Sequence, residues 1–481
     1  MFIFVHSQIN KIFMSVDKIK FGTDGWRAII AKDFTVNNVA RVSKAVADWL
    51  YKQFPQPVVV IGHDCRFGGE LFAETVAKVL CENKVKVIIA KGFVSTPMVS
   101  FGVTRMKAHQ GVVITASHNP PAYNGFKLKG AHGGPSNPAD IAAVEALIPD
   151  AAEVPATSLA EYQDKGLLEW IDLETMYCNY LKEKFDFTAL NNSAFGLAYD
   201  AMYGAGQNVV RRLLPAAHLI HCEENPSFMG QAPEPLHRNL QELSRYIQFN
   251  DDIKIGLATD GDADRIGLYD EDGNFVDAHH IILLLIHYLH KYQGMTGKVA
   301  VAFSTTGRVK KMCQVYGLPY EVTPIGFKYI SEIMTREDVL VGGEESGGIA
   351  VKGHIPERDG IYDGLVLYEY MTKSGKTLKE LCEEIYEVVG RFVFERNDLH
   401  LAEEKKQAII AHCKAGTYTS FGKYKVEKTE DLDGYKYHLD NGGWIMIRPS
   451  GTEPLLRIYA EGATRDEVVN MLETVQSIIL A

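Results

Sequence analysis

The chain of 481 residues is long enough for three or four domains that each bury a core of their own. Hydrophobic residues make up 46% and charged residues 23%, and no apolar stretch is long enough to cross a bilayer, so we expect no membrane partner and a soluble protein. A formal net charge of -11 argues against a nucleic-acid partner, because phosphate backbones need a basic face, and seven cysteines without a CxxC pair favour the reducing cytoplasm.

The first residues, MFIFVHSQINKIFM, contain a short apolar run with no basic segment before it, which is not typical of a secretory signal. The fold signal begins just after Met14, at KIKFGTDGW. We therefore expect residues 1–17 to be an N-terminal extension, either a disordered arm or a segment read from an upstream start codon.

Strand-like apolar runs and helix-like patterns then alternate in three weakly similar units. Their segments are, in chain order, 57–64, 71–83, 85–92, 111–114, 193–206, 207–217, 298–307 and 308–317. This alternation is typical of α/β domains, in which ligands bind beyond the carboxyl ends of the strands. Because each unit also has a strand that ends in a polar, glycine-rich loop, we expect three loops to converge on one central cleft.

The last part of the chain has the pattern of a small α+β domain. Its expected elements are strands at 390–398, 434–440, 443–451 and 455–462 and helices at 402–414 and 465–480. Linker-like segments at 147–161, at the Asp272-Gly273 turn and near Gly390 separate the units. The prediction is an α/β protein with three related mixed α/β domains and a C-terminal α+β domain, spanning residues 18–150, 170–275, 276–390 and 391–481.

The stretch ITASHNPPAYNGFKLKG, residues 114–130, places Ser117 just past the apolar strand 111–114. His118 and the pair Pro120-Pro121 exclude a helix and stiffen the loop, Tyr123-Asn124-Gly125 predicts a second turn, and Lys127 follows within reach. Such a loop can carry catalytic groups, or it can be a turn that needs serine and asparagine for local hydrogen bonds. A serine hydrolase does not fit, because the chain lacks a G-x-S-x-G elbow here and an adjacent His118 would point away from the serine.

A second loop, ATDGDADRIG, has carboxylates at alternating positions after a strand: Asp260, Asp262 and Asp264. Acids this close repel one another unless a hard divalent cation neutralises them, so we expect a metal site. An EF-hand would use the same spacing with Glu271 as its last ligand, but Arg265 stands where that loop needs glycine, and a strand precedes it. A solvated acidic turn is the remaining alternative.

Two further loops carry groups suited to a phosphorylated sugar. IRPSGTEP offers the fork of Arg448 and a phosphate nest formed by Ser450, Gly451 and Thr452. GGEESGG places Glu344 and Ser346 between glycines, where acceptors can meet sugar hydroxyls, while Glu345 is expected to face elsewhere. Each loop can also be a plain turn.

Cations are spread over several of these segments. Arg27 follows the glycine-bracketed FGTDGW turn and Lys328 follows the glycine of TPIGFKYI. Either one alone is more typical of a surface cation. Together with Arg265, Arg448 and Lys127 they are expected to form a cationic lining for an anionic substrate within an acidic protein.

The four loops TASHNPPAYNGFKLKG, TDGDADR, GGEESGG and RPSGTEP, in this order, look like the active-site loops of the α-D-phosphohexomutase family. The resemblance runs from about Lys18 to the end of the chain and is closest to bacterial phosphoglucomutase/phosphomannomutase members. It implies three phosphoglucomutase-type α/β domains and a fourth, hinged phosphate-binding domain around a cleft. It also implies exchange of a phosphate between C1 and C6 of a hexose, with sugar phosphates as the small-molecule partners and glucose 1,6-bisphosphate as intermediate or activator.

The resemblance also implies roles for single residues. Ser117 would carry the phosphoryl group and, with Asp260, Asp262 and Asp264, would hold Mg²⁺; His118 and Lys127 would be acid/base groups, with Arg27 and Arg265 supporting the phosphoserine and the metal loop. Sugar hydroxyls would contact Glu344 and Ser346, and the phosphate that does not react would be held by Arg448, Ser450, Gly451 and Thr452. From the cationic lining described above we also expect Arg265 and Lys328 to contact the substrate.

One departure concerns the sugar loop, where several bacterial members have a histidine and this chain has Gly348. We expect His354, together with Arg358, to reach the cleft instead. Tyr123 is more typical of the enzymes that act on glucose and mannose phosphates, because phosphoglucosamine mutases tend to have Asp at this position. The alternatives are a phosphoglucosamine mutase, a glucose 1,6-bisphosphate synthase and a non-catalytic sugar-phosphate binding protein. The sequence carries no signal for an oligomeric state.

Overall fold

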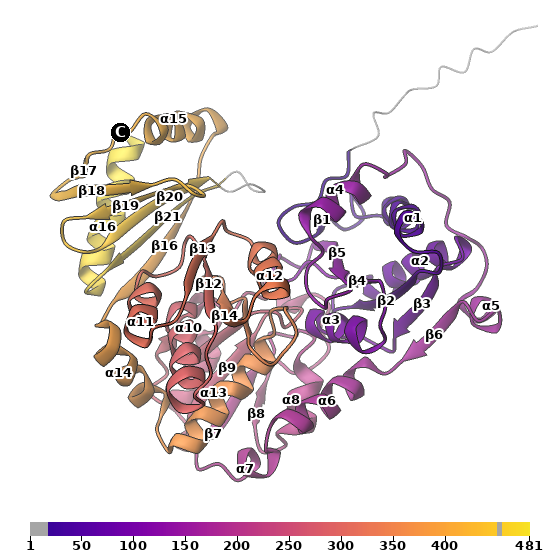
Figure 1. Cartoon of the computed structure of the whole chain (residues 1–481), viewed down its shortest axis with the longest axis horizontal. Coiled ribbons are helices and arrows are strands. Elements are labelled where there is room, and N and C mark those ends of the chain that lie inside the picture. Colours follow the sequence, from indigo (N-terminus) through magenta and orange to yellow (C-terminus); the bar gives the residue numbers. More distant parts are fainter. Residues whose placement is uncertain (1–17, 450–454) are drawn as a thin grey trace, which may run out of the picture.

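The structure, a computed structural model, describes residues 18–449 and 455–481, and these form four domains with one main β-sheet each (Figure 1). The expected N-terminal extension, residues 1–17, lies outside the described residues. No helix within the described ranges is long and apolar enough to cross a membrane. The predicted class, three mixed α/β domains followed by an α+β domain, is confirmed.

Domain I has a mixed sheet of order β1-β5-β4-β2-β3-β6. Alternate residues of β2 enter two different cores: Val59 and Ile61 pack with α1 and α2, whereas Val60 packs with α3, as expected for a strand covered on both faces. The strands are β1 Trp26–Ile29, β2 Val58–His63, β3 Lys86–Ala90, β4 Gln110–Ile114, β5 Tyr123–Gly130 and β6 Leu168–Ile171, and the helices are α1 Val36–Gln53, α2 Gly69–Glu82, α3 Thr96–Arg105, α4 Pro138–Glu145 and α5 Leu159–Asp164.

Two expectations for domain I were wrong. Tyr123, Asn124 and Gly125 do not form a second turn but open β5, where Tyr123 pairs with Ile29 of β1. Pairing with strands on both sides outweighs the turn preference of Asn-Gly. The domain also does not end at residue 150, because β6 at 168–171 lies parallel to β3 and completes the sheet.

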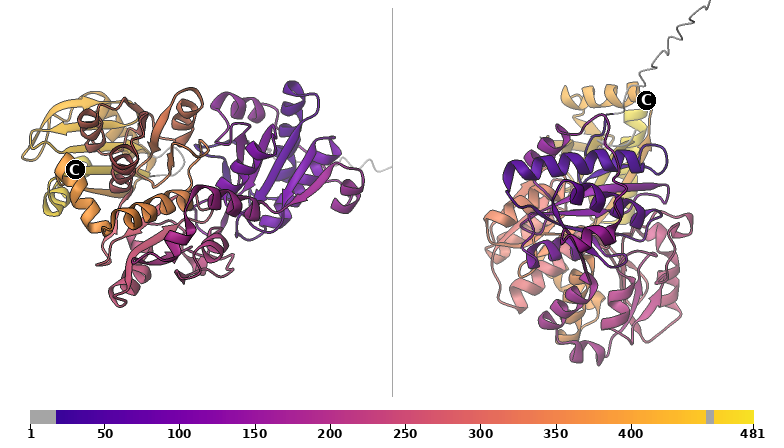
Figure 2. Two further views of the ribbon diagram at one scale, coloured as in Figure 1. Left: turned by 60° about the horizontal axis from the view of Figure 1, so that its bottom comes forward. Right: turned by 90° about the vertical axis from the view of Figure 1, so that its right-hand side faces the viewer.

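Domains II and III form the middle of the molecule (Figures 1 and 2). Their sheets have the orders β11-β10-β9-β7-β8 and β13-β12-β14-β15. The strands are β7 Gly196–Asp200, β8 His218–Ile220, β9 Ile253–Thr259, β10 Ile266–Tyr269, β11 Phe275–Val276, β12 Lys298–Ala302, β13 Tyr320–Thr323, β14 Val339–Gly343 and β15 Ile349–Val351. The α-helices are α6 Leu173–Lys184, α7 Phe187–Asn191, α8 Gln207–Leu213, α9 Gln241–Gln248, α10 Ala278–His287, α11 Arg308–Tyr316, α12 Phe327–Arg336, α13 Gly360–Ser374 and α14 Leu378–Val389.

Domain IV is an antiparallel sheet of order β16-β21-β20-β19-β18-β17 covered by helices. Sequence analysis missed β17 and β18, because the alternation in YKVEKTE is mostly between exposed polar residues at the sheet edge. The elements are β16 Val393–His400, α15 Glu403–Lys414, β17 Ser420–Phe421, β18 Tyr424–Glu430, β19 Tyr435–Leu439, β20 Trp444–Pro449, β21 Leu455–Gly462 and α16 Arg465–Leu480.

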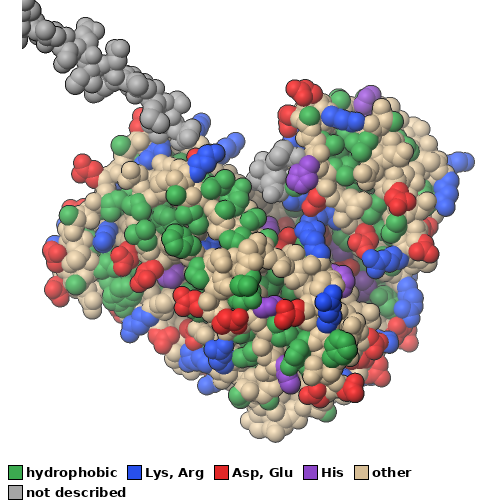
Figure 3. All heavy atoms as spheres, turned by 180° about the vertical axis from the view of Figure 1, so that it is seen from behind, with side chains coloured by type: hydrophobic (Ala, Val, Ile, Leu, Met, Phe, Trp, Pro, Cys, Tyr) green, Lys and Arg blue, Asp and Glu red, His purple; other side chains and the backbone are tan. Residues whose placement is uncertain are grey.

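Domain IV is joined to domain III by a buried lysine. Lys436 Nζ donates to the carbonyls of Phe303, at 3.1 Å, and Thr305, at 3.2 Å, and lies 3.8 Å from the centroid of the Trp444 ring. Seen from behind, the surface is hollowed between domain IV and domain I, and lysine and arginine side chains lie along this hollow (Figure 3).

Candidate active site

Ser117 lies in the loop that follows β4 and is 1% exposed. Its φ of 50° is in the left-handed region, which is unusual for a residue with a Cβ and is typical of functional sites. Its N–H donates to Thr115 Oγ1 at 2.8 Å, and its Oγ donates to Asp260 Oδ2 at 2.7 Å. The expectation that His118 points away was wrong, because His118 Nδ1 lies 3.4 Å from Ser117 Oγ.

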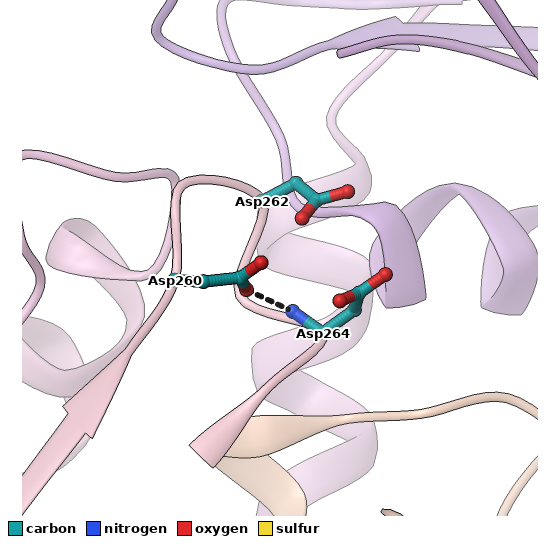
Figure 4. Close-up of side chains that lie close together, drawn as sticks. All are labelled: Asp260, Asp262 and Asp264. Atoms are coloured by element: carbon teal, nitrogen blue, oxygen red, sulfur yellow. Dashed lines mark hydrogen bonds between the residues drawn. The ribbon is translucent and has the colours of Figure 1, made fainter. Parts of the chain in front are cut away.

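The partner of Ser117 belongs to a buried group of carboxylates in the loop after β9. One ligand atom each from Asp260, Asp262 and Asp264 lies within 4.8 Å of the others (Figure 4). Asp260 Oδ1 accepts the N–H groups of Asp264, at 2.9 Å, and Arg265, at 3.1 Å, so the backbone folds around this carboxylate. Ala263, with a φ of 56°, makes the sharp bend between the aspartates possible.

The donor set of this loop suits a divalent cation. Asp262 Oδ1 and Asp264 Oδ1 are buried and have no hydrogen-bond partner within residues 18–449 and 455–481. Burial, and then the charges of the other two aspartates, raise the pKa of Asp260 well above its ordinary value. Mg²⁺ prefers hard oxygen ligands. It would also satisfy the two unpartnered acceptors and relieve the mutual repulsion of the carboxylates. The three carboxylates and Ser117 Oγ are therefore the residues that would hold it.

Lys127, on β5, lies among carboxylates. Its Nζ is 2.8 Å from Asp262 Oδ2, 2.9 Å from Asp264 Oδ2 and 2.9 Å from Asp24 Oδ2. Burial lowers the pKa of Lys127, but the three carboxylates outweigh burial and raise it, so this ammonium group is charged at neutral pH.

The pKa of His118 is shifted in the opposite direction. Burial, followed by the cations Arg265 and Arg27, lowers its pKa well below the usual value. His118 is therefore neutral at neutral pH. The neutral imidazole, 3.4 Å from Ser117 Oγ, can accept a proton, and the charged ammonium group of Lys127, bonded to the aspartate loop that Ser117 contacts, can donate one.

The two arginines near Ser117 come from different domains. Arg27, on β1, donates from Nη1 to Asn119 Oδ1 at 2.7 Å, and so contacts the serine loop. Arg265 directly follows the aspartates, and its Nη1 lies 3.4 Å from Glu234 Oε1. Both guanidinium groups lower the pKa of His118, so both lie close enough to act on the serine loop.

Glu344 directly follows β14 and accepts the N–H of Gly326 at 2.8 Å. Burial raises its pKa to about 7. Glu345 turns to another partner, Ser304, whereas Ser346 is half-buried. Lys328, in the first turn of α12, lines a cavity of about 180 Å³ together with Asp24, between domains I and III.

The structure does not bring His354 into the cleft. Its Nε2 is 2.9 Å from Asp359 Oδ2, its Nδ1 is 2.9 Å from Tyr180 Oη, and its ring stacks on Tyr362 at 4.0 Å. The side chain is 1% exposed and both nitrogens are occupied, so the expectation that it reaches a substrate was wrong.

Arg358, by contrast, does reach the site. Its Nη2 bonds Asp24 and lies 2.7 Å from Asp264 Oδ2. A Cβ on Gly348 would lie only 2.5 Å from Arg358 Cδ. The arginine therefore fills the space that a side chain at position 348 would need.

Of the four residues predicted to hold phosphate in the IRPSGTEP loop, the structure describes only Arg448. It pairs with Asp433, Nε to Oδ1, at 2.9 Å, and Asp433 Oδ2 also accepts the N–H of Ile325 in domain III at 2.9 Å. Ser450, Gly451 and Thr452 lie outside the described residues.

Sequence reasoning missed three residues of this site. Asp24 joins Lys127 to Arg358, and Thr96 at the start of α3 donates from Oγ1 to Asp262 Oδ2 at 2.5 Å. Arg66, beyond the carboxyl end of β2, contacts the serine loop. Asp24 and Arg66 could have been found from the sequence, because both are charged residues in loops rich in glycine. Thr96 could not, because it looks like an ordinary first residue of a helix.

Models of the phosphoglucomutase/phosphomannomutase family match four segments of the chain. They describe alpha/beta/alpha domain I at residues 18–154, domain II at 175–273, domain III at 277–389 and the C-terminal domain at 401–476.

Similar proteins carry two kinds of name. A phosphoglucomutase/phosphomannomutase of Thermococcus kodakarensis is 28% identical over 94% of this chain and 96% of its own. A phosphoglucosamine mutase of Bacillus velezensis is 29% identical over 93% and 95%. A crystal structure of a candidate phosphomannomutase from Thermus thermophilus is 31% identical, has a TM-score of 0.85, and is matched over 97% of this chain and 100% of that one.

Proposed function

Because this chain belongs to the phosphoglucomutase/phosphomannomutase family of α-D-phosphohexomutases, we propose that it interconverts a hexose 1-phosphate and a hexose 6-phosphate through a phosphoserine at Ser117. The observation that carries the proposal is the contact of Ser117 Oγ with Asp260, at 2.7 Å, in a buried group of carboxylates and cations. Phosphomonoesters hydrolyse so slowly that enzymes accelerate such reactions by up to about 10²¹-fold, chiefly through positioning and charge neutralisation.

The proposed cycle has two transfers. The bond from phosphorus to Ser117 Oγ breaks while a bond to the free hydroxyl of the sugar phosphate forms, which gives a hexose 1,6-bisphosphate. His118, neutral, takes the proton of the attacking hydroxyl, and Lys127, charged, supplies a proton to the serine oxygen. The bisphosphate turns over, its other phosphoryl group returns to Ser117, and the proton transfers reverse. Mg²⁺, when bound, supplies charge neutralisation at the reacting phosphoryl group.

The remaining polar groups are assigned to substrate binding. Arg448, with Ser450, Gly451 and Thr452, would hold the phosphate that does not react, and Glu344 and Ser346 would bind sugar hydroxyls. Arg27 and Arg265 would support the phosphoserine, and Lys328 and Arg358 would line the cleft. Because Asp433 bridges Arg448 and Ile325, movement of domain IV would change the phosphate site and the interface together.

The preferred hexose is proposed to be glucose or mannose, with Tyr123 as the supporting residue. The relative named phosphoglucosamine mutase, at 29% identity, supports glucosamine equally. A coupled assay with glucose 1-phosphate, mannose 1-phosphate and glucosamine 1-phosphate, each with and without Mg²⁺, ranks the three. Turnover of none would contradict the proposal, and net release of bisphosphate instead of isomerisation would favour a glucose 1,6-bisphosphate synthase.

The pKa of Glu344 predicts a pH dependence of substrate binding. With a pKa raised to about 7, the carboxyl group is protonated below that pH and ionised above it. A hydrogen bond to a charged acceptor is stronger by about 1 kcal/mol, which is about fivefold in binding. We therefore expect KM to fall about fivefold from pH 6 to pH 8, and Glu344→Gln to remove this change. Glu345→Gln, at the neighbouring carboxylate, serves as control; a Glu344→Gln profile equal to that of the wild type would refute the assignment.

The contact of Gly348 with Arg358 predicts the effect of a single added methyl group. In Gly348→Ala the new Cβ would overlap Arg358 Cδ, at 2.5 Å, and push the guanidinium group away from Asp264. Overpacking of this kind costs about 1–3 kcal/mol, so we expect kcat/KM to fall about tenfold or more. Gly307→Ala is the matched control, because a Cβ there meets nothing within 4 Å. Equal activity of the two variants would argue against a role for Arg358.

A further inference from the structure

Arg66 is a buried arginine whose guanidinium group lies beneath the serine loop. The residue is 3% exposed and follows the carboxyl end of β2. Its hydrogen bonds go to backbone carbonyls of the 117–123 loop: Nη2 donates to Ser117 and, at 2.6 Å, to Asn119, and Nη1 donates to Pro120 at 3.0 Å and Tyr123 at 3.2 Å. The mechanism described above makes no use of this residue.

The segment that contains Arg66 also anchors the backbone N–H of Ser117, through Asp64 and Thr115. Arg66 Nε lies 3.3 Å from Asp64 Oδ2, and that oxygen accepts the hydroxyl of Thr115 at 2.5 Å. Thr115 Oγ1 in turn accepts the N–H of Ser117 at 2.8 Å. The N–H and the C=O of Ser117 are therefore both tied to the 64–66 segment.

These hydrogen bonds hold Ser117 in an unfavourable backbone conformation. A left-handed φ of 50° is strained at a serine, and such a conformation persists only where surrounding contacts hold it in place. One rigid fork with five donors can fix several carbonyls at once, whereas a lysine ammonium group cannot match their spacing.

Arg66 also contacts domain II. Its Cζ lies 4.9 Å from the centroid of the Phe228 ring. A Cβ on Gly261, next to the metal-loop aspartates, would lie 2.6 Å from the carbonyl oxygen of Ser117 and 3.6 Å from Arg66 Nη2. The arginine thus lies where the serine loop of domain I and the aspartate loop of domain II touch.

We propose that Arg66 is a positioning residue for phosphoryl transfer: it holds the 117–123 loop in the strained conformation that points Ser117 Oγ at the aspartate loop. The inference rests on the proposed function, and it assigns to Arg66 no contact with substrate. Displacement of a reacting group by about 1 Å can reduce a rate by about 100-fold, so the effect belongs in kcat rather than in KM.

Arg66→Ala and Arg66→Lys test this, with Arg41→Ala as matched control. Arg41 is a buried arginine of the same domain, 6% exposed, that donates from Nε to the carbonyl of Pro149 at 2.7 Å, in a linker that carries none of the predicted site residues. We measure kcat, KM, melting temperature and the single-turnover rate at which labelled phosphoserine transfers its phosphoryl group to the sugar phosphate.

Both Arg66 variants should lose about 100-fold in kcat and in the transfer rate, with KM changed less than about threefold. Guanidinium ion at millimolar concentration should restore part of the activity of Arg66→Ala and should not affect Arg41→Ala. A purely structural role would lower the melting temperature without this rescue.

Two results would overturn the inference: Arg66→Ala as active as Arg41→Ala, or Arg66→Lys with wild-type kcat. The lysine variant keeps the positive charge beside Asp64, so it decides the question if the alanine variant does not fold. A wild-type enzyme inactive on all three sugar phosphates would refute the proposed function itself, whereas an active wild type with active Arg66 variants would refute only the role of Arg66.

Discussion

Replacement of Ser117 by alanine is expected to abolish both turnover and uptake of a phosphoryl group from glucose 1,6-bisphosphate. In the proposed cycle every transfer passes through this hydroxyl, and water cannot replace it at a useful rate. The fold should survive, because the change removes only the hydrogen bond to Asp260 and the longer contact with His118, and a typical hydrogen bond contributes about 1 kcal/mol. A coupled assay, intact-mass measurement of the phosphorylated protein and thermal melting together check the prediction.

A buried serine elsewhere in domain I provides the control for this experiment. Ser43 on α1 donates to the carbonyl of Val39 at 2.8 Å, and this helix carries none of the predicted site residues. Ser43→Ala should fold and turn over like the wild type. Full activity of a clean Ser117→Ala preparation would exclude the phosphoserine scheme, and loss of folding in both variants would show that the assay reports stability instead.

The convergence of the active-site loops was predictable because it follows from topology. Ser117 follows β4, the aspartate loop follows β9, and Glu344 follows β14, so each functional loop leaves the carboxyl end of a strand. A strand with apolar residues on both faces is visible in the sequence as a continuous apolar run, and the polar loop after it stands out.

The contacts that complete the site were not predictable, because they join residues far apart in sequence. Asp24 and Arg358 are separated by most of the chain, yet they share an ion pair that fixes Lys127. His354 and Arg358 looked equally suited to the cleft. Only the packing of His354 against Tyr180 and Tyr362 decides between them.

The pKa directions give His118 and Lys127 separate roles that the sequence left undivided. The lysine is held charged by three carboxylates, and the histidine is held neutral by burial and two arginines. The proposed acid and base are thus set apart by their neighbours and not by their residue types.

The second large effect is expected from the aspartate loop. Chelation of divalent cations with EDTA should abolish wild-type activity, and Asp262→Asn should raise the Mg²⁺ concentration needed for half-maximal rate by about tenfold or more. Like charges about 4 Å apart repel by about 4 kcal/mol at an effective dielectric of 20, and a divalent ion reverses this cost. The buried acceptors Asp262 Oδ1 and Asp264 Oδ1, without a hydrogen-bond partner among the described residues, are the atoms such an ion would satisfy.

Thermal melting measures this site without any catalytic readout. An ion that binds only the folded state stabilises it by about 2.7 kcal/mol at 100 times its dissociation constant, so Mg²⁺ should raise the melting temperature of the wild type and raise that of Asp262→Asn much less. Asp272→Asn is the control, since this exposed carboxylate of the same domain pairs with Lys379 and lies in a turn outside the metal loop. It should keep the full Mg²⁺ response. A wild-type enzyme that works equally well in EDTA and melts at the same temperature with and without Mg²⁺ would show that Lys127 and the arginines neutralise the aspartates on their own.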